Sequence, residues 1–270
     1  MTGNRLLCFG LGYTARTLVR RLGPGWTMAA TTRGDDGPLL PEGGFDGVTH
    51  VLVSIPPGGG GDPTLDRYGS DIAGLKDLRW LGYLSTTGVY GSRDGGWVDE
   101  TSELRPSGPR GERRAAAERE WLKLGAHVFR LAGIYGPGRS AFDALRAGSA
   151  RRIDAGGQVF SRIHVYDIAS VLLASMARKR PAAIYPGAIY NVCDDEPAAQ
   201  EAVVAHAARL IGLKPPPLVP LAAAELTPMA RSFYADNKRV ANARIKTELG
   251  VALAYPSYRE GLAGILAAGG

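Results

Sequence analysis

A glycine-rich turn separates the first apolar run of the chain from its first helical pattern. Residues 5–9 form a run of strand length, and the sequence Gly10-Leu-Gly12-Tyr-Thr-Ala15 follows at once. The next apolar side chains recur at the spacing of one helical face, at Ala15, Leu18, Val19 and Leu22. In such a turn the first glycine permits a tight bend, the second lets the backbone approach a phosphate, and a small third residue allows close packing of helix on strand. The turn therefore predicts a pyrophosphate-binding unit, against the alternative of a structural turn that binds nothing.

Segments of strand type and helix type alternate along the rest of the chain. The predicted strands cover 5–9, 26–32, 48–55, 81–85, 128–132 and 190–193, and the predicted helices after the first cover 71–80, 111–124, 167–178 and 198–211. This alternation is typical of βαβ units, so we predict an α/β fold: a doubly wound Rossmann parallel sheet with a small C-terminal substrate lobe. We expect residues 1–136 and 161–211 to form the dinucleotide-binding core, and residues 137–160 and 212–270 to form the lobe. The proline- and glycine-rich run 56–61 is predicted to be a mobile loop, and Asp167 to cap its helix.

Composition excludes several classes of protein. Of the 270 residues, 45% are hydrophobic and 21% are charged, which is typical of a soluble globular protein. No apolar run approaches the ~20 residues of a membrane span, and the N-terminus lacks a secretory signal pattern, so we expect a cytoplasmic protein. Cys8 and Cys193, each beside apolar residues, are predicted to be buried free thiols, and the four histidines lack metal-site spacing. The net charge of +6 comes largely from scattered arginines, so no nucleic-acid partner is expected.

The end of the second predicted strand favours NADP over NAD. Arg33 follows Thr32 there, and a guanidinium at this place suits the 2′-phosphate of NADP. Asp35 and Asp36 are the opposing signal, which we interpret as turn residues because they follow a glycine. NAD stays the alternative cofactor. The predicted cofactor contacts are Gly10, Gly12, Tyr13, Thr14, Ala15, Thr32, Arg33, Ser54, Ile55, Pro56 and Ala132.

Several further segments resemble one family, in the family's own order. Residues 84–91 (LSTTGVYG) resemble the strand-four motif of the extended short-chain dehydrogenases/reductases, the group of nucleotide-sugar epimerases and dehydratases. Residues 130–137, 162–169 and 190–195 resemble the later motifs of that group. The opening turn and residues 235–240 (ADNKRV) resemble an atypical branch of it. The resemblance spans nearly the whole chain and implies a Rossmann fold, bound NAD(P) and a nucleotide-sugar-like substrate.

The catalytic residues that the resemblance implies are only partly present. The family uses a Ser or Thr, a Tyr and a Lys four residues after that Tyr. Thr86 matches the first position, but Arg110 and Arg114 stand where the Tyr and Lys should be. Arginine stays protonated at neutral pH and cannot relay a proton. The sequence Tyr234-x-x-x-Lys238 lies far along the chain, in the predicted lobe, and we interpret it as a chance match.

Other side chains could complete the site. Tyr90 and Tyr135 lie in motifs that resemble loops facing the active site, so either could supply a phenol acid, although packing is the commoner role of such tyrosines. Arg114 could hold the nicotinamide ribose, and with Arg110 and Arg113 it could bind a phosphate or carboxylate, unless this is a solvated helix face. The remaining candidates, each with a structural role as the alternative, are Asp94, Asp99, Glu100 and His164.

Two hypotheses about function follow. The first is an NADP-dependent oxidoreductase, of epimerase, dehydratase or reductase type, in which Thr86 orients the oxygen of a hydroxylated, anionic small molecule. The second is a catalytically inactive protein that senses NADP(H) and signals to a partner. The missing Tyr/Lys pair favours the second, and the retained Thr86 and lobe favour the first. We expect a small-molecule substrate and no membrane partner; the oligomeric state stays open, with a homodimer as one option.

Overall fold

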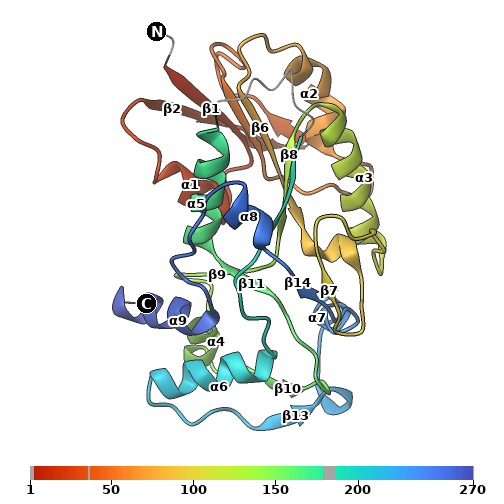
Figure 1. Cartoon of the computed structure of the whole chain (residues 1–270), viewed down its shortest axis with the longest axis vertical. Coiled ribbons are helices and arrows are strands. Elements are labelled where there is room, and N and C mark those ends of the chain that lie inside the picture. Colours follow the sequence, from red (N-terminus) through yellow and green to blue (C-terminus); the bar gives the residue numbers. More distant parts are fainter. Residues whose placement is uncertain (1–2, 36, 179–186, 270) are drawn as a thin grey trace.

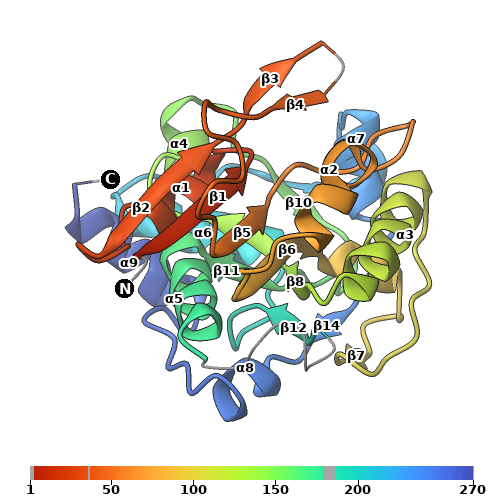
Figure 2. The ribbon, with the colours of Figure 1, turned by 90° about the horizontal axis from the view of Figure 1, so that it is seen from above.

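A parallel sheet of six strands forms the centre of the protein. The structure is a computed structural model, and it describes residues 3–35, 37–178 and 187–269. The strand order across the sheet is β12-β8-β6-β5-β1-β2 (Figures 1 and 2). These strands are β1 (Asn4–Phe9), β2 (Trp26–Ala30), β5 (His50–Val53), β6 (Trp80–Thr86), β8 (His127–Leu131) and β12 (Ile189–Val192). The predicted α/β fold is therefore confirmed, and the chain order changes direction between β1 and β5, where such sheets bind ligands.

Helices cover both faces of this sheet (Figure 2). Side chains of β1 alternate between the faces: Leu6 and Cys8 pack in one apolar cluster, and Leu7 and Phe9 in another. The first cluster includes residues of α1 (Tyr13–Val19) and α5 (Val165–Met176), and the second includes residues of α2 (Pro63–Ala73) and α3 (Pro109–Lys123). Burial on both faces explains why β1, β5, β6 and β8 are largely apolar, whereas the edge strand β2 is partly exposed.

A second group of elements lies beyond the carboxyl ends of the strands, at the bottom of Figure 1. Helix α6 packs against α4, α9 and β10, and β10 pairs with β13. The bounds are α4 (Ala141–Arg146), β10 (Arg152–Asp154), α6 (Gln200–Leu210), β13 (Leu218–Pro220), α7 (Pro228–Phe233) and α9 (Tyr258–Ala267). Helix α8 (Ala243–Thr247) instead contacts β12 of the sheet. The division into core and lobe at residues 136, 160 and 211 stays a prediction. Helix α6, assigned to the core, packs against elements of the lobe, and α8, assigned to the lobe, packs against the sheet.

The remaining elements are short and lie outside the central sheet. Strand β9 pairs with β11, β7 with β14, and β3 with β4 in a hairpin. The 3-10 turn η1 follows β6, and the 3-10 turn η3 precedes α7. Their bounds are β3 (Thr32–Gly34), β4 (Gly37–Leu39), η1 (Thr87–Tyr90), β7 (Trp97–Val98), β9 (Gly133–Tyr135), β11 (Arg162–His164), η3 (Leu221–Ala223) and β14 (Arg239–Val240).

Three local predictions were wrong. The helix predicted at 71–80 is α2 at 63–73, because Asp62 caps it by accepting from the backbone N–H of Thr64 at 3.0 Å, and Pro63 suits its first position. The strand predicted to run to residue 32 ends at Ala30, before the β3–β4 hairpin. Asp167 does not cap α5.

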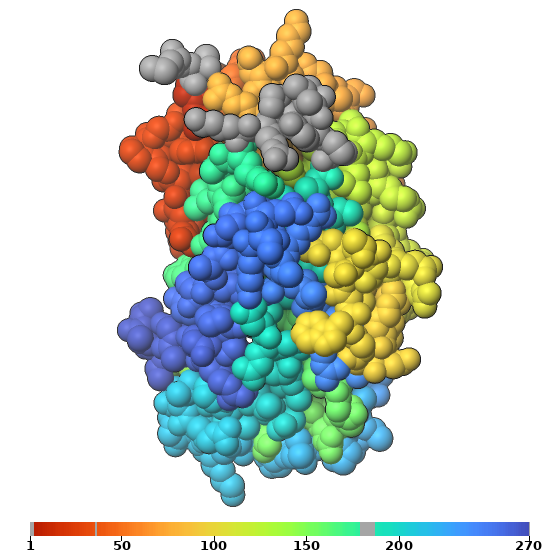
Figure 3. Space-filling model, viewed as in Figure 1, coloured from red at the N-terminus to blue at the C-terminus, as the bar shows by residue number. Residues whose placement is uncertain are grey.

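The cap of α5 is His164, whose Nδ1 accepts from the backbone N–H of Tyr166 at 3.2 Å. The buried carboxylate of Asp167 accepts instead from the backbone N–H groups of Ala254 at 2.8 Å and Tyr255 at 3.0 Å. Asp167 therefore ties the C-terminal segment to the core. In the space-filling view this blue C-terminal segment crosses the front of the molecule (Figure 3).

The expectations drawn from composition can also be compared with the structure. Cys8 and Cys193 are free and buried, as predicted. Within residues 3–35, 37–178 and 187–269, no group of three or more His, Cys, Asp or Glu side chains could hold a metal ion. No helix in the same ranges is long and apolar enough to cross a membrane.

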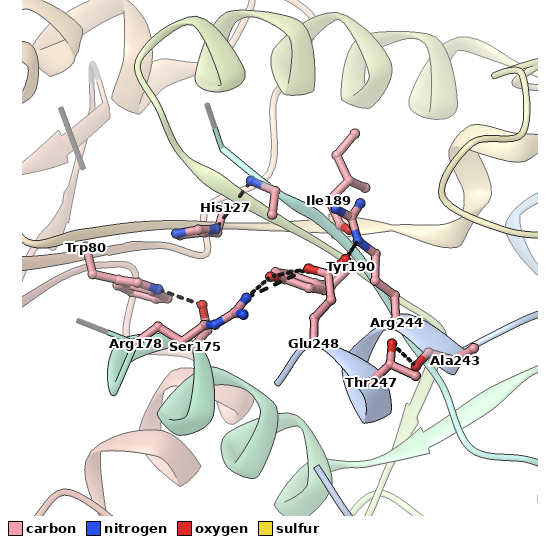
Figure 4. Close-up of polar contacts among 11 residues, drawn as sticks. Trp80, His127, Ser175, Arg178, Ile189, Tyr190, Ala243, Arg244, Thr247 and Glu248 are labelled. Carbon is pink, nitrogen blue, oxygen red and sulfur yellow. Dashed lines mark hydrogen bonds and ion pairs between the residues drawn. The ribbon is translucent and has the colours of Figure 1, made fainter. Parts of the chain in front are cut away.

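A polar cluster attaches α8 to the sheet (Figure 4). The Tyr190 hydroxyl accepts from Arg178 Nη1 at 3.2 Å and donates to Glu248 Oε2 at 3.3 Å. Arg244 donates to Glu248 Oε1 at 2.5 Å and to the backbone oxygen of Ile189 at 3.0 Å. Glu248 therefore joins α8, β12 and the segment after α5.

We expect Glu248→Ala to lower the free energy of unfolding by about 1 kcal/mol, because these half-exposed contacts to charged partners are each modest. Urea unfolding of the variant measures the loss. Thr247→Val is the matched control, since among the described residues its hydroxyl bonds within α8, to Ala243 O at 3.1 Å. An equal loss in both variants would contradict the role of Glu248.

Candidate active site

The glycine turn after β1 has the geometry that a glycine requires. Gly10 has a φ of 86°, and a Cβ there would lie 2.8 Å from Ser54 Oγ and 2.9 Å from Ile55 Cγ1. Ser54 Oγ donates to Gly10 O at 2.7 Å, and the Gly10 N–H donates to Thr31 Oγ1 at 3.2 Å. The predicted residues Gly10, Ser54 and Ile55 therefore meet at the ends of β1 and β5.

The second glycine leaves open space above the turn. A Cβ on Gly12 would meet no atom within 4 Å, and no side chain caps the start of α1. Thr14 and Ala15 are buried beneath the turn. The Tyr13 hydroxyl donates to Pro137 O at 3.0 Å, and the Arg139 guanidinium lies 5.9 Å from the centre of its ring. An open backbone face beside free N–H groups fits the pyrophosphate of a dinucleotide.

The residues predicted to select NADP lie next to this turn. Thr32 and Arg33 are exposed on β3, directly after the threonine that bonds Gly10. Arg33 pairs with Pro38 across the β3–β4 hairpin. Asp35 is exposed in the turn of the hairpin, and Asp36 lies outside the described residues. Arg33 thus follows by two residues the threonine that bonds the glycine turn, and the choice between NADP and NAD stays a prediction.

A cavity of about 1000 Å³ lies between the carboxyl ends of the strands and the elements beyond them. Its lining includes seven of the predicted site residues: Ser54, Pro56, Thr86, Arg110, Arg114, Ala132 and Tyr135. Thr86 is half-buried, and its Oγ1 accepts from the Gly88 N–H at 3.1 Å, so that its proton can still be donated. The structure therefore brings Ser54, Pro56 and Ala132, which are predicted to contact the cofactor, and Thr86 to one cavity.

The two arginines at the positions of the family's Tyr and Lys differ in their surroundings. Arg114 Nη1 donates to Leu84 O at 2.6 Å, and its guanidinium lies 5.7 Å from the centre of the Tyr83 ring. Arg110 is exposed, with its guanidinium 5.9 Å from the Phe233 ring. Arg114 is thus held against β6, while Arg110 reaches toward α7. Both add positive charge to the cavity wall.

The two tyrosines considered as acids are poorly suited to that role. Tyr90 is wholly buried: its hydroxyl donates to Asn191 Oδ1 at 2.7 Å and accepts from Arg130 Nη1 at 2.8 Å. Burial raises the pKa of Tyr90 to about 12 and raises that of Tyr135 as well. Tyr135 lines the cavity, but its hydroxyl donates to Ser257 O at 3.2 Å. Catalytic roles for both stay predictions, and their surroundings favour packing roles.

Asp99, Glu100 and His164 have structural contacts. Asp99 accepts from Thr101, which lowers the pKa of Asp99. Burial raises the pKa of Glu100, whose carboxylate accepts from the Asn191 N–H of β12 at 2.8 Å. Burial lowers the pKa of His164 to about 4, so its ring is neutral at pH 7. Asp94 is exposed, and Arg113 is not among the described residues that line the cavity.

The far wall of the cavity holds residues that the sequence did not single out as a site. Its charged members are Arg139, Arg151, Arg162, Asp236 and Lys238. Tyr234 lines the same cavity, so both members of the pair interpreted as a chance match reach the cavity that Thr86 lines. Arg162 is held by Phe160 O and Ala198 O, both at 2.8 Å. In the sequence, the four-residue spacing of Tyr234 and Lys238 was the signal that could have pointed to this wall. The fold then shows that both residues reach the cavity.

Comparisons with known proteins agree with this architecture. No family model matches the chain. A functionally unknown conserved protein from Silicibacter pomeroyi is 54% identical, with 98% of this chain and 99% of that chain covered and a TM-score of 0.90. A 3-diazoavenalumate denitrifying reductase from Streptomyces sp is 32% identical over 55% of this chain, and the match spans about half, 51%, of that reductase.

More distant solved structures share the fold. A putative NAD-dependent epimerase/dehydratase from Methylobacillus flagellatus is 22% identical, with 99% of each chain covered and a TM-score of 0.70. Others in this range of identity are complexes with NAD or NADPH. The chain therefore belongs to one family with the Silicibacter protein and has the fold of the extended short-chain dehydrogenases/reductases, and its sequence is compatible with an atypical member of that group.

Proposed function

We propose that the chain is an NADP(H)-dependent oxidoreductase acting on a small anionic molecule that carries a hydroxyl or carbonyl oxygen. The observation that carries the proposal is one cavity that reaches from Ser54, beside the glycine turn, to Thr86 and Arg114. Bound NADP(H) would exchange a hydride with the substrate, and the Thr86 hydroxyl would hold the substrate oxygen. The name of the Streptomyces relative supports the reductive direction.

Charge supports an anionic substrate. Six cationic side chains line the cavity and one carboxylate faces them: Arg110, Arg114, Arg139, Arg151, Arg162, Lys238 and Asp236. In a partly enclosed cavity such an excess favours phosphate or carboxylate groups. A nucleotide sugar and an aromatic keto acid both satisfy this requirement. The cavity also has apolar lining from Phe160, Phe233 and Leu262, which suits a planar or ring-shaped body.

The test combines cofactor binding with turnover. Titration calorimetry measures NADPH affinity, and loss of reduced-nicotinamide absorbance measures turnover over a panel of nucleotide sugars, aldehydes and aromatic keto acids. We expect Thr86→Val to lower kcat/KM about 10²-fold, the usual cost of removing one oriented donor, with NADPH affinity unchanged. Thr101→Val, on the exposed loop after β7, is the matched control and should keep wild-type turnover.

The second candidate function is an inactive NADP(H) sensor. The arginines at positions 110 and 114 favour it, since neither can relay a proton. Tight NADPH binding without turnover of any panel compound, together with NADP(H)-dependent association with a partner, would replace the oxidoreductase proposal with this one.

A further inference from the structure

The segment from Phe233 to Lys238 lies against the N-terminal end of α3. The Arg110 guanidinium is 5.9 Å from the Phe233 ring, and Ser107 Oγ donates to Asp236 Oδ1. Tyr234 and Lys238 line the same cavity as Thr86. The segment thus brings a phenol and an ammonium to the end of the helix that carries arginines at the positions of the family's Tyr and Lys.

The backbone around Lys238 is held firmly. Asn237 O accepts from the N–H groups of Arg93 at 2.8 Å and Gly95 at 3.0 Å, and Asn237 Oδ1 accepts from the Val159 N–H at 3.2 Å. Directly after Lys238 the chain enters β14, which pairs with β7. Hydrogen bonds on two sides therefore fix the position from which the Lys238 side chain extends, as an oriented catalytic group requires.

The surroundings shift the pKa values of Lys238 and Tyr234 in opposite directions. Lys238 is only 9% exposed, and its Nζ donates to Asp236 Oδ2 at 3.3 Å. Burial lowers the pKa of Lys238; Asp236 opposes this shift and Arg93 adds to it. Burial raises the pKa of Tyr234, and the charge of Arg162 opposes it only in part. A more acidic ammonium and a less acidic phenol favour the lysine as proton donor near neutral pH.

We propose that Lys238, oriented by Asp236, donates the proton to the substrate oxygen in this cavity, in place of the tyrosine that α3 lacks. The inference rests on the proposed oxidoreductase function. As a carbonyl carbon accepts a hydride with its two electrons from NADPH, the C=O π electrons move to oxygen, and that oxygen takes one proton from Nζ. The products are an alcohol, NADP⁺ and a neutral lysine, which regains a proton from water. Asp236 is a positioning residue in this scheme.

The first test uses NADPH and phenylglyoxylate, an aromatic keto acid. We expect Lys238→Met to lower kcat/KM by at least about 10²-fold, the usual contribution of a general acid, with unchanged NADPH affinity. Lys238→Arg keeps the charge but cannot release the proton, so it should be equally impaired. Lys246→Met is the control, because Lys246 pairs with Asp195 outside the cavity. Full turnover by Lys238→Arg, or loss of turnover in Tyr234→Phe alone, would overturn the proposal.

The pH profile gives a second activity readout. Because the donor must be protonated, wild-type kcat/KM should fall as pH rises through the pKa of Lys238, below the ordinary range of a lysine. A profile without that limb, in a wild type that turns the keto acid over, would contradict proton donation by Lys238. Melting temperatures of all variants show whether each is folded.

The last readout needs no turnover, so it separates this inference from the proposed function. The protein is treated with formaldehyde and cyanoborohydride, and peptide mapping gives the methylation rate of each lysine. We expect Lys238 to be labelled at a lower pH than Lys246, and to be protected when NADP⁺ and phenylglyoxylate are both present. Labelling that the two ligands leave unchanged would remove Lys238 from the site, even if NADPH binds. If the ligands protect Lys238 from methylation in a protein that turns over no substrate, the oxidoreductase proposal is wrong, but Lys238 still lies at the ligand-binding site.

Discussion

Replacing Glu118 by alanine should lower the free energy of unfolding by about 3–5 kcal/mol, the usual cost of leaving a buried charge without its partner. Glu118 and Arg130 are 1% and 3% exposed, and Arg130 Nη2 lies 2.7 Å from Glu118 Oε2. Ser85 Oγ donates to the other carboxylate oxygen at 2.5 Å. The variant would leave the Arg130 guanidinium in the interior with the Tyr90 hydroxyl as its remaining polar contact.

Urea unfolding measures the effect, and Glu120→Ala on the same helix is the matched control. Glu120 pairs with Lys123 at 2.8 Å, but both side chains are largely exposed, so its loss should cost less than about 1 kcal/mol. Because Ser85 lines the cavity, we also expect Glu118→Ala to weaken ligand binding there. A cost below about 1 kcal/mol for Glu118→Ala would mean that Arg130 finds another partner or that water reaches it.

Much of the sheet could be predicted because a strand that is buried on both faces has a continuous run of apolar residues in the sequence. Each of the six central strands contains or overlaps an apolar run such as 5–9 or 128–132. The error at α2 has an equally local cause. Gly69 interrupts the helical pattern, and the glycine run before Asp62 hides the cap, although Asp62 followed by Pro63 is a helix-start signal.

The candidate site was less predictable because its two walls come from distant parts of the chain. Thr86, Arg110 and Arg114 follow the order of known motifs, so the core wall could be found by resemblance. Lys238 lines the cavity, and the neighbouring Asn237 is held by the loop after η1 and by Val159. Such long-range contacts produce no periodic pattern in the sequence. A Tyr-x-x-x-Lys match alone therefore does not show whether the two residues lie at the cavity or match by chance.

The charge of Arg33 should decide cofactor preference. If its guanidinium binds the 2′-phosphate of NADP, Arg33→Ala removes a charge-assisted contact of about 1.5–3 kcal/mol. We therefore expect the Kd for NADPH to rise about 10- to 150-fold. The Kd for NADH should stay near its wild-type value, because NADH has no phosphate at that position. Titration calorimetry of both cofactors on the same preparation measures the two changes.

The comparison between cofactors makes this prediction independent of any change in folding. Thr31, whose hydroxyl accepts from the Gly10 N–H, directly precedes β3. A change in β3 that disturbed the glycine turn would weaken the binding of both cofactors, because both would use that turn. Arg20→Ala, an exposed arginine at the end of α1, is the matched control for a general loss of positive charge. Equal weakening of NADPH by both variants would indicate long-range attraction, which salt also screens. Weakening confined to Arg33→Ala and to NADPH requires direct contact, because only the 2′-phosphate distinguishes the two ligands.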